Sequence, residues 1–318
     1  MKTICILLVC AVSLTIVAAG DSCSGRCDSG FSGSYDCQCN THCVNYGDCC
    51  ADYSQQCLGS PTDLQTLADA LWSGDVNRAD SKQFTVNKQT FLSNTNDQVD
   101  RSSAPLLSYV DSSLLSKDTY AKFIALLDNY EARTGIDDSP SLAETREKDA
   151  FVSAILSTNV MELTYDFLFL KGKVSSKQDF QAQFEDMWFK SYSRSSPSDT
   201  SGFEHVFVGE QKSSSVSGFH NWIQLNSEEN NGALNYYGYS KEASPNLLLF
   251  QFSWDGKIKK LSSIMFGASP EFEMALFTTC FLTERNNLCS FKLDGNNVDI
   301  QTYDYKGESV IGSAYFSV

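Results

Sequence analysis

Between residues 118 and 190, apolar side chains recur at the spacing of helices. One stripe repeats at i, i+3, i+4, i+7 and i+10 and comprises Tyr120, Phe123, Ile124, Leu127 and Tyr130. These positions lie on one face of a helix, and Gly135 follows where that helix is expected to end. Ser141 and Glu144 have the spacing of an N-terminal capping box. Two further apolar faces follow, formed by Phe151, Val152 and Ile155, and by Phe180, Phe184, Met187 and Trp188.

After a polar segment at residues 191–197 the pattern changes. Short apolar runs rich in aromatic and β-branched residues alternate with Gly, Asn, Asp and Ser, which predicts strands. The runs cover residues 203–208, 219–225, 247–252, 262–266, 291–293 and 298–303. Because helices come first and strands later, we expect an α+β fold with a helical N-terminal part and antiparallel β-rich subdomains, rather than an alternating parallel α/β sheet.

The first sixty residues differ from this body, residues 61–318. Residues 1–20 combine an early lysine, an apolar run and a small-residue ending, which predicts a secretory signal peptide. Eight of the 12 cysteines lie between Cys23 and Cys57, and this density predicts a disulfide knot over residues 21–60. The spacing lacks the paired short repeats and histidines of common zinc modules. No later apolar run is long enough to span a membrane, so we expect a secreted, extracellular protein.

The formal net charge of −15 argues against a general nucleic-acid-binding protein. General nucleic-acid binding relies on lysine and arginine releasing counterions from phosphates, so a nucleic-acid substrate would need a local positive site here. The sequence contains neither a Gly-x-Ser-x-Gly elbow nor a cysteine–histidine arrangement suited to proteolysis.

Two of the three histidines, His205 and His220, stand fifteen residues apart, and three lysines follow within residues 257–260. One neutral imidazole, one protonated imidazole and a fixed cation are the groups that metal-independent cleavage of an RNA phosphodiester requires. In a strand, His205 would share its face with Phe203 and Phe207, which is also the pattern of a histidine packed in an aromatic core. Glycines beside both histidines indicate turns near a cleft and favour the catalytic interpretation.

Four motifs in order resemble the poly(U)-specific endoribonuclease (EndoU) family. They are GFEHVFVGE at 202–210, GFHNW at 218–222, GASPEFE at 267–273 and IGSAY at 311–315, and WxxDVNR at 72–78 lies near the start of the same stretch. The cysteine spacing in residues 23–57, with Cys-Gln-Cys and Asp-Cys-Cys-Ala-Asp-Tyr, resembles a somatomedin B domain. The combination is similar to the placental-protein-11-like secreted members of the family.

The resemblance implies that His205 and His220 are the acid/base pair and that Lys259 is the catalytic cation. It further implies that three residues contact the substrate: Ser263, Ser313 and Tyr315. The implied reaction is cleavage of single-stranded RNA at uridylates, in which the 2′-hydroxyl attacks phosphorus and leaves a 2′,3′-cyclic phosphate. DNA lacks this hydroxyl and is expected to be inert.

The resemblance also implies stimulation by a divalent cation, manganese first and calcium second. Glu204 and Glu210 flank His205 and either ligate that cation or orient the imidazole. The implied disulfides are Cys23–Cys39, Cys27–Cys57, Cys37–Cys50 and Cys43–Cys49, while Cys280 and Cys289 can close a short loop in the body. We expect a monomer whose somatomedin B module binds an extracellular protein. The alternative is a secreted binding protein with an inactive ribonuclease body that acts through this module.

Overall fold

The computed structural model describes residues 22–46, 48–50, 53–57, 59, 61–137, 139–195 and 199–318. The signal peptide predicted for residues 1–20 lies outside this range. The chain divides after Gly59 into two compact units. Among the helices described, none is both long and apolar enough to cross a membrane.

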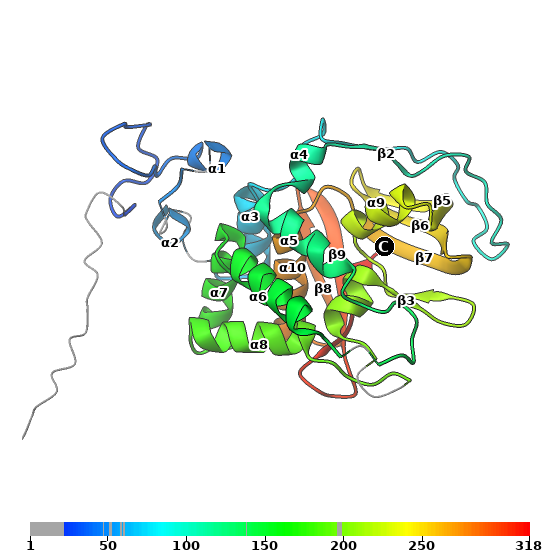
Figure 1. Cartoon of the computed structure of the whole chain (residues 1–318). Helices are drawn as coiled ribbons and strands as arrows, with labels where there is room; N and C mark the ends of the chain where they lie inside the picture. Colours follow the sequence, from blue (N-terminus) through cyan, green and yellow to red (C-terminus); the bar gives the residue numbers. More distant parts are fainter. Residues whose placement is uncertain are drawn as a thin grey trace, which may run out of the picture. The chain divides into compact units, whose positions relative to one another are not determined.

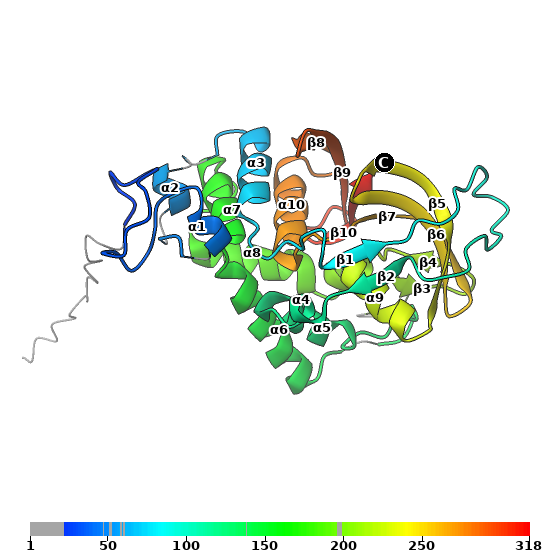
Figure 2. The ribbon, with the colours of Figure 1, turned by 90° about the horizontal axis from the view of Figure 1, so that it is seen from above.

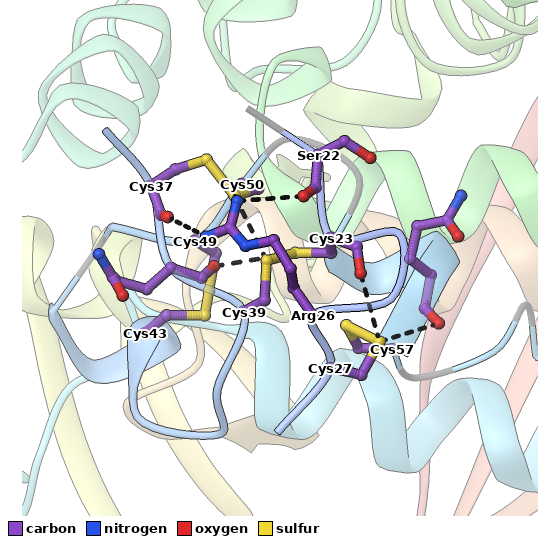
Figure 3. The surroundings of a disulfide bond; sticks show 12 residues. Ser22, Cys23, Arg26, Cys27, Cys37, Cys39, Cys43, Cys49, Cys50 and Cys57 are labelled. Atoms are coloured by element: carbon purple, nitrogen blue, oxygen red, sulfur yellow. Dashed lines mark hydrogen bonds between the residues drawn. A yellow bond between two sulfur atoms is a disulfide. The ribbon is translucent and has the colours of Figure 1, made fainter. Parts of the chain in front are cut away.

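The first unit is held together by disulfides. The helices described in it, α1 (Cys43–Tyr46) and α2 (Tyr53–Cys57), are short. The structure pairs the cysteines as the somatomedin B resemblance implies: Cys23–Cys39, Cys27–Cys57, Cys37–Cys50 and Cys43–Cys49 (Figure 3). Arg26 lies among these bridges, where its guanidinium donates to the Cys37 carbonyl at 2.9 Å and lies 3.6 Å from the centre of the Tyr35 ring. Cross-links replace the hydrophobic core that so short a segment cannot build.

The second unit combines helices with antiparallel sheets, which confirms the α+β fold class. Its α-helices are α3 (Leu64–Gly74), α4 (Ser112–Leu115), α5 (Asp118–Leu127), α6 (Leu142–Leu156), α7 (Asn159–Leu170), α8 (Lys177–Phe189), α9 (Trp222–Asn230) and α10 (Pro270–Thr283). A π-helical segment, η1, covers Glu204–Val208. The views in Figures 1 and 2 place α7 and α8 on one side of this unit, strands β5–β7 on the other, and α10 with β8–β10 between them.

Each sheet joins strands that follow one another along the chain. The larger sheets have the orders β5-β6-β7 and β10-β9-β8, and two strand pairs, β1-β2 and β3-β4, are separate. The bounds are β1 (Phe84–Val86), β2 (Leu107–Val110), β3 (Glu210–Gln211), β4 (Val216–Ser217), β5 (Leu234–Ser244), β6 (Leu247–Trp254), β7 (Lys257–Met265), β8 (Leu288–Leu293), β9 (Asn296–Asp304) and β10 (Ile311–Ser317). The runs predicted at 247–252, 291–293 and 298–303 lie in strands, and the run at 262–266 does so up to Met265.

The predicted helical faces are buried, although one boundary was wrong. Helix α5 buries Tyr120 and Phe123, but it ends at Leu127 instead of continuing towards Gly135. Helix α6 begins with the predicted capping box: the Ser141 hydroxyl accepts from the Glu144 amide, and the Glu144 carboxylate accepts from the Ser141 amide. The capping residues carry a local signal, whereas the apolar spacing alone does not mark where α5 stops.

Two of the predicted strands are wrong, and both carry the candidate histidines. Residues 203–208 form η1 and its N-cap, and residues 222–225 begin α9. Phe203 and Phe207 stand four residues apart and both pack edge-on against Phe123, at 5.5 and 5.6 Å between ring centres. A short run rich in aromatic and β-branched residues fits a buried helical turn as well as a strand, and here aromatic packing decides. The strand-based face assigned to His205 is therefore wrong.

Helix α10 runs through the core and fixes the segment that follows His220. The Asn221 side chain accepts from the amides of Ile223 and Gln224, which caps α9. Its amide nitrogen also donates to Glu273 of α10 at 2.6 Å. The neighbouring Trp222 donates its indole N–H to the Ala268 carbonyl. These bonds join the GFHNW and GASPEFE motifs into one framework, and the Cys280–Cys289 disulfide ties α10 to β8.

Candidate active site

The six residues predicted as catalytic or substrate-contacting line a single open cavity of about 420 Å³. They are His205, His220, Lys259, Ser263, Ser313 and Tyr315. Segments far apart in the sequence supply them, namely η1, the residues before α9, and strands β7 and β10. Glu204 lies elsewhere, on the wall of a separate cavity of about 360 Å³ that also contacts Tyr130 and Lys148. Glu210 is buried and contacts His205, which lines the first cavity.

The backbone fixes the spacing between the two histidines. The Phe219 amide donates to the His205 carbonyl at 3.0 Å, and the His220 amide donates to the Val206 carbonyl at 2.7 Å. Gly218 makes this approach possible because it has a φ of +64°, and a Cβ at this position would lie 1.7 Å from the His205 carbonyl oxygen. A side chain is therefore excluded here both by backbone conformation and by space.

His220 is held as a neutral imidazole. Its Nδ1 lies 3.2 Å from the Ser263 carbonyl oxygen, which favours the tautomer with a proton on Nδ1 and leaves Nε2 able to accept one. The Tyr315 ring stacks on the imidazole at 5.4 Å between ring centres. Burial, and then the positive charges of Lys259 and His205, hold the pKa of His220 well below its ordinary value of 6.5. The geometry suits a general base.

His205 faces a carboxylate instead. Its Nδ1 lies 3.1 Å from Glu210 Oε1, and that oxygen also accepts from the Thr200 hydroxyl at 2.7 Å and pairs with Arg194 Nε at 2.8 Å. The pKa of His205 lies below its ordinary value of 6.5, because burial lowers it more than the contact with Glu210 raises it. Burial opposes ionisation of Glu210, yet His205, Arg194 and Thr200 hold its pKa at about 2. A carboxylate that favours the imidazolium form suits a general acid.

Lys259 brings a buried ammonium group to the same cavity and is only 8 % exposed. Burial lowers its pKa to about 8, with Glu210 raising it and Lys212 lowering it further. The group remains mostly protonated at neutral pH. A cation in a partly dry site acts strongly on an anion placed there, because little water screens it.

Comparison with known proteins agrees with this geometry. Residues 63–316 match the family model described as Endoribonuclease XendoU, and residues 21–60 match the Somatomedin B domain model. The chain belongs to the XendoU family. It is 37% identical to the uridylate-specific endoribonuclease of Bos taurus, over 96% of this chain and 79% of that protein. It is also 37% identical to the protein of the same name from Paralichthys olivaceus, over 99% of both chains.

A solved structure of XendoU, described as a splicing-independent snoRNA-processing endoribonuclease, matches the fold. The TM-score is 0.69 at 33% identity, and the match covers 80% of this chain and 96% of that one. With the XendoU family identified, the chain is an enzyme of the endoribonuclease class. The somatomedin B match and its disulfides are typical of extracellular domains.

Arg194 and Thr200 are the site residues that the sequence did not reveal. Besides Glu210, the Arg194 guanidinium contacts the Gly312 carbonyl at 2.5 Å and the Tyr192 hydroxyl at 3.1 Å. It thus connects the carboxylate behind His205 with strand β10, which carries Ser313. Arg194 stands in the segment read as a polar connector, and no local pattern distinguishes it there from a solvated arginine.

The contacts of Glu210 fit the orienting role better than that of a cation ligand. Its Oε1 already serves His205, Thr200 and Arg194, and the guanidinium compensates its charge. Across the described residues, the only cluster of three His, Cys, Asp or Glu ligand atoms close enough for a metal is formed by Cys23, Cys39 and Cys50, which are disulfide-bonded. Glu204 and Glu210 therefore do not assemble a ready three-ligand cation site, and no catalytic step is assigned to one.

Replacing Glu210 with glutamine is expected to lower kcat by about tenfold to a hundredfold, the range for loss of a hydrogen bond to a charged group. Without the carboxylate the pKa of His205 falls further, so the proton needed for leaving-group protonation is lost at lower pH. The alkaline limb of the pH–rate profile should therefore move to lower pH. A profile with an unchanged alkaline limb in a folded Glu210→Gln protein would show that Glu210 does not act through His205.

Proposed function

We propose that this protein cleaves single-stranded RNA on the 3′ side of uridylates by transesterification. The observation that carries the proposal is the convergence of His205, His220 and Lys259 on one cavity. Two imidazoles in unlike electrostatic surroundings and one ammonium group are what this chemistry needs. The names of the similar proteins, uridylate-specific endoribonucleases, support the choice of substrate.

In the proposed reaction, His220 Nε2 takes the proton from the ribose 2′-hydroxyl. The 2′-oxygen forms a bond to the adjacent phosphorus while the bond from phosphorus to the 5′-oxygen breaks. His205 Nε2 donates its proton to that leaving oxygen, since its Nδ1 faces Glu210. Lys259 stabilises the charge that gathers on the nonbridging oxygens. The products are a 2′,3′-cyclic phosphate and a 5′-hydroxyl end, so the reaction is of the lyase type and DNA is not a substrate.

Uracil selection is assigned to the far wall of the cavity. Ser263 and Ser313 offer hydroxyl groups to the polar edge of the base, and Tyr315 offers an aromatic ring. Because Tyr315 also stacks on His220, base binding and placement of the general base share one residue.

We also propose that the protein is secreted, because a signal peptide is predicted for residues 1–20 and the first unit is held together by disulfides. We also predict that the somatomedin B module binds an extracellular protein. We further predict that the protein is a monomer. The module has a surface suited to such a partner, because Phe31 and Tyr46 are 77% and 78% exposed beside a cavity of about 540 Å³. Stimulation by manganese, or by calcium, also stays a prediction from the family resemblance.

The test of the proposal is cleavage of a short single-stranded RNA that contains one uridine, with matched RNAs carrying cytidine or adenosine at that position. The full secreted chain should cut the uridine RNA at that one site, in buffers with manganese or calcium. A folded wild-type protein that leaves all three RNAs intact under these conditions would contradict the proposal and favour the binding protein with an inactive ribonuclease body.

A further inference from the structure

The sheet β10-β9-β8 has one face that is only partly covered. Strand β10 buries Ala314 and Phe316, and the Phe316 ring packs 5.1 Å from that of Phe277 in α10. The neighbouring strand β9 buries Ile300 and Thr302 on the same side. Since side chains alternate between the two faces of a strand, the residues between these positions lie on the opposite face.

The register defines what this opposite face carries. Ser313 pairs with Tyr303, and Tyr315 pairs with Gln301, so these four side chains share a face. Gln301 pairs in turn with Leu288 of β8. The face is open to solvent: Tyr303 is 45% exposed and Leu288 is 48% exposed.

This open face is continuous with the catalytic cavity, because Ser313 and Tyr315 belong to both. The Tyr303 ring centre lies 6.5 Å from that of Tyr315, and Tyr315 stacks in turn on His220. Burial raises the pKa of Tyr315, and its contacts with the Tyr303 side chain raise it further. An aromatic row therefore runs from the general base, through Tyr315, out to an exposed tyrosine on the next strand.

We propose that this open sheet face binds the nucleotide next to the cleaved uridine, with the Tyr303 ring stacking on its base. The inference rests on the proposed function and extends it to a subsite. Exposed aromatic rings on antiparallel sheets bind single-stranded RNA by stacking, which requires no cations. That mode suits a chain of net charge −15, because it does not depend on many contacts between lysines and phosphates.

The test uses an RNA that the enzyme binds without cleaving it, with 2′-deoxyuridine at the cut position and the fluorescent base 2-aminopurine on its 5′ or its 3′ side. Stacking on Tyr303 should quench the fluorescence of one of these two probes when wild-type protein binds. Tyr303→Leu should abolish that quenching and raise Kd about tenfold, within the range that one base–aromatic stack contributes. Tyr303→Phe should behave like wild type because it keeps the ring.

Tyr109→Leu is the matched control, since Tyr109 is 50% exposed but lies in the separate β1-β2 pair. The inference is wrong if Tyr303→Leu binds and quenches like wild type, or if wild type quenches neither probe. It is also wrong if Tyr303→Phe weakens binding as much as Tyr303→Leu, because the hydroxyl contact with Tyr315 would then be the cause. If the subsite fails in one of these ways while the wild-type protein still cleaves at uridine, the proposed function stands. If the wild-type protein does not cleave at uridine, the proposed function and the subsite are both wrong.

Discussion

Replacing His220 with alanine is expected to lower kcat for uridine cleavage by about 10² to 10⁴-fold, and His205→Ala should have an effect of the same size. His220→Ala removes the acceptor for the 2′-hydroxyl proton, and His205→Ala removes the donor to the leaving 5′-oxygen. The two losses should not multiply in the double variant, because the two groups act in the same step. Single-turnover rates on an RNA with one uridine measure both effects.

The chain supplies its own control for this experiment, because it has only three histidines. His42 lies exposed in the first unit, and His42→Ala should cleave at the wild-type rate. Both histidines of the proposed acid/base pair are buried, so thermal unfolding of each variant must be measured alongside. If folded His205→Ala and His220→Ala proteins retain wild-type rates, the assignment of the acid/base pair is wrong.

Lys259→Gln is expected to reduce kcat by about 10² to 10³-fold, the range found when one group that stabilises developing charge is removed. The neighbouring Lys260 is exposed and provides a matched control, since Lys260→Gln should retain nearly all activity. The pKa of Lys259, about 8, provides a second and independent test of its role. The ammonium form is lost as pH rises through this value, so the wild-type rate should fall there.

The same dependence on pH should be missing from Lys259→Gln, because glutamine does not titrate. Comparison of the two pH–rate profiles above neutrality therefore separates Lys259 from other groups that lose a proton on the alkaline side. Equal losses of activity in Lys259→Gln and Lys260→Gln would instead indicate general attraction of RNA by positive charge, without a specific catalytic cation.

The sequence predicted those elements whose signal is local. The capping box of α6 involves two residues three apart, and the stripe of α5 follows a clear helical period. The segments around His205 and His220 lack such a signal, because short apolar runs fit a strand and a buried helical turn equally. In the folded chain, the Phe203 and Phe207 contacts with Phe123 and the Asn221 cap select the helical forms.

The candidate site was predictable through motifs, but its supporting contacts were not. His205, His220 and Lys259 could be named from their motifs and their residue types. Their meeting in one cavity depends on the topology of β7 and β10, which periodicity does not reveal. Arg194 illustrates the limit most clearly, because it lies in a polar connecting segment and no sequence pattern predicts its contact with Glu210. That contact favours Glu210 as a residue that orients His205 over Glu210 as a cation ligand.

The measurement closest to the central claim is analysis of the cut ends of an RNA with a single uridine, compared with the same RNA carrying 2′-deoxyuridine at that position. We expect wild-type enzyme to leave a 2′,3′-cyclic phosphate on one product and a 5′-hydroxyl on the other, and to leave the deoxyuridine RNA intact. Cleavage at the deoxyuridine position, or a 5′-phosphate on the downstream product, would contradict attack by the 2′-hydroxyl and with it the assigned roles of His205, His220 and Lys259.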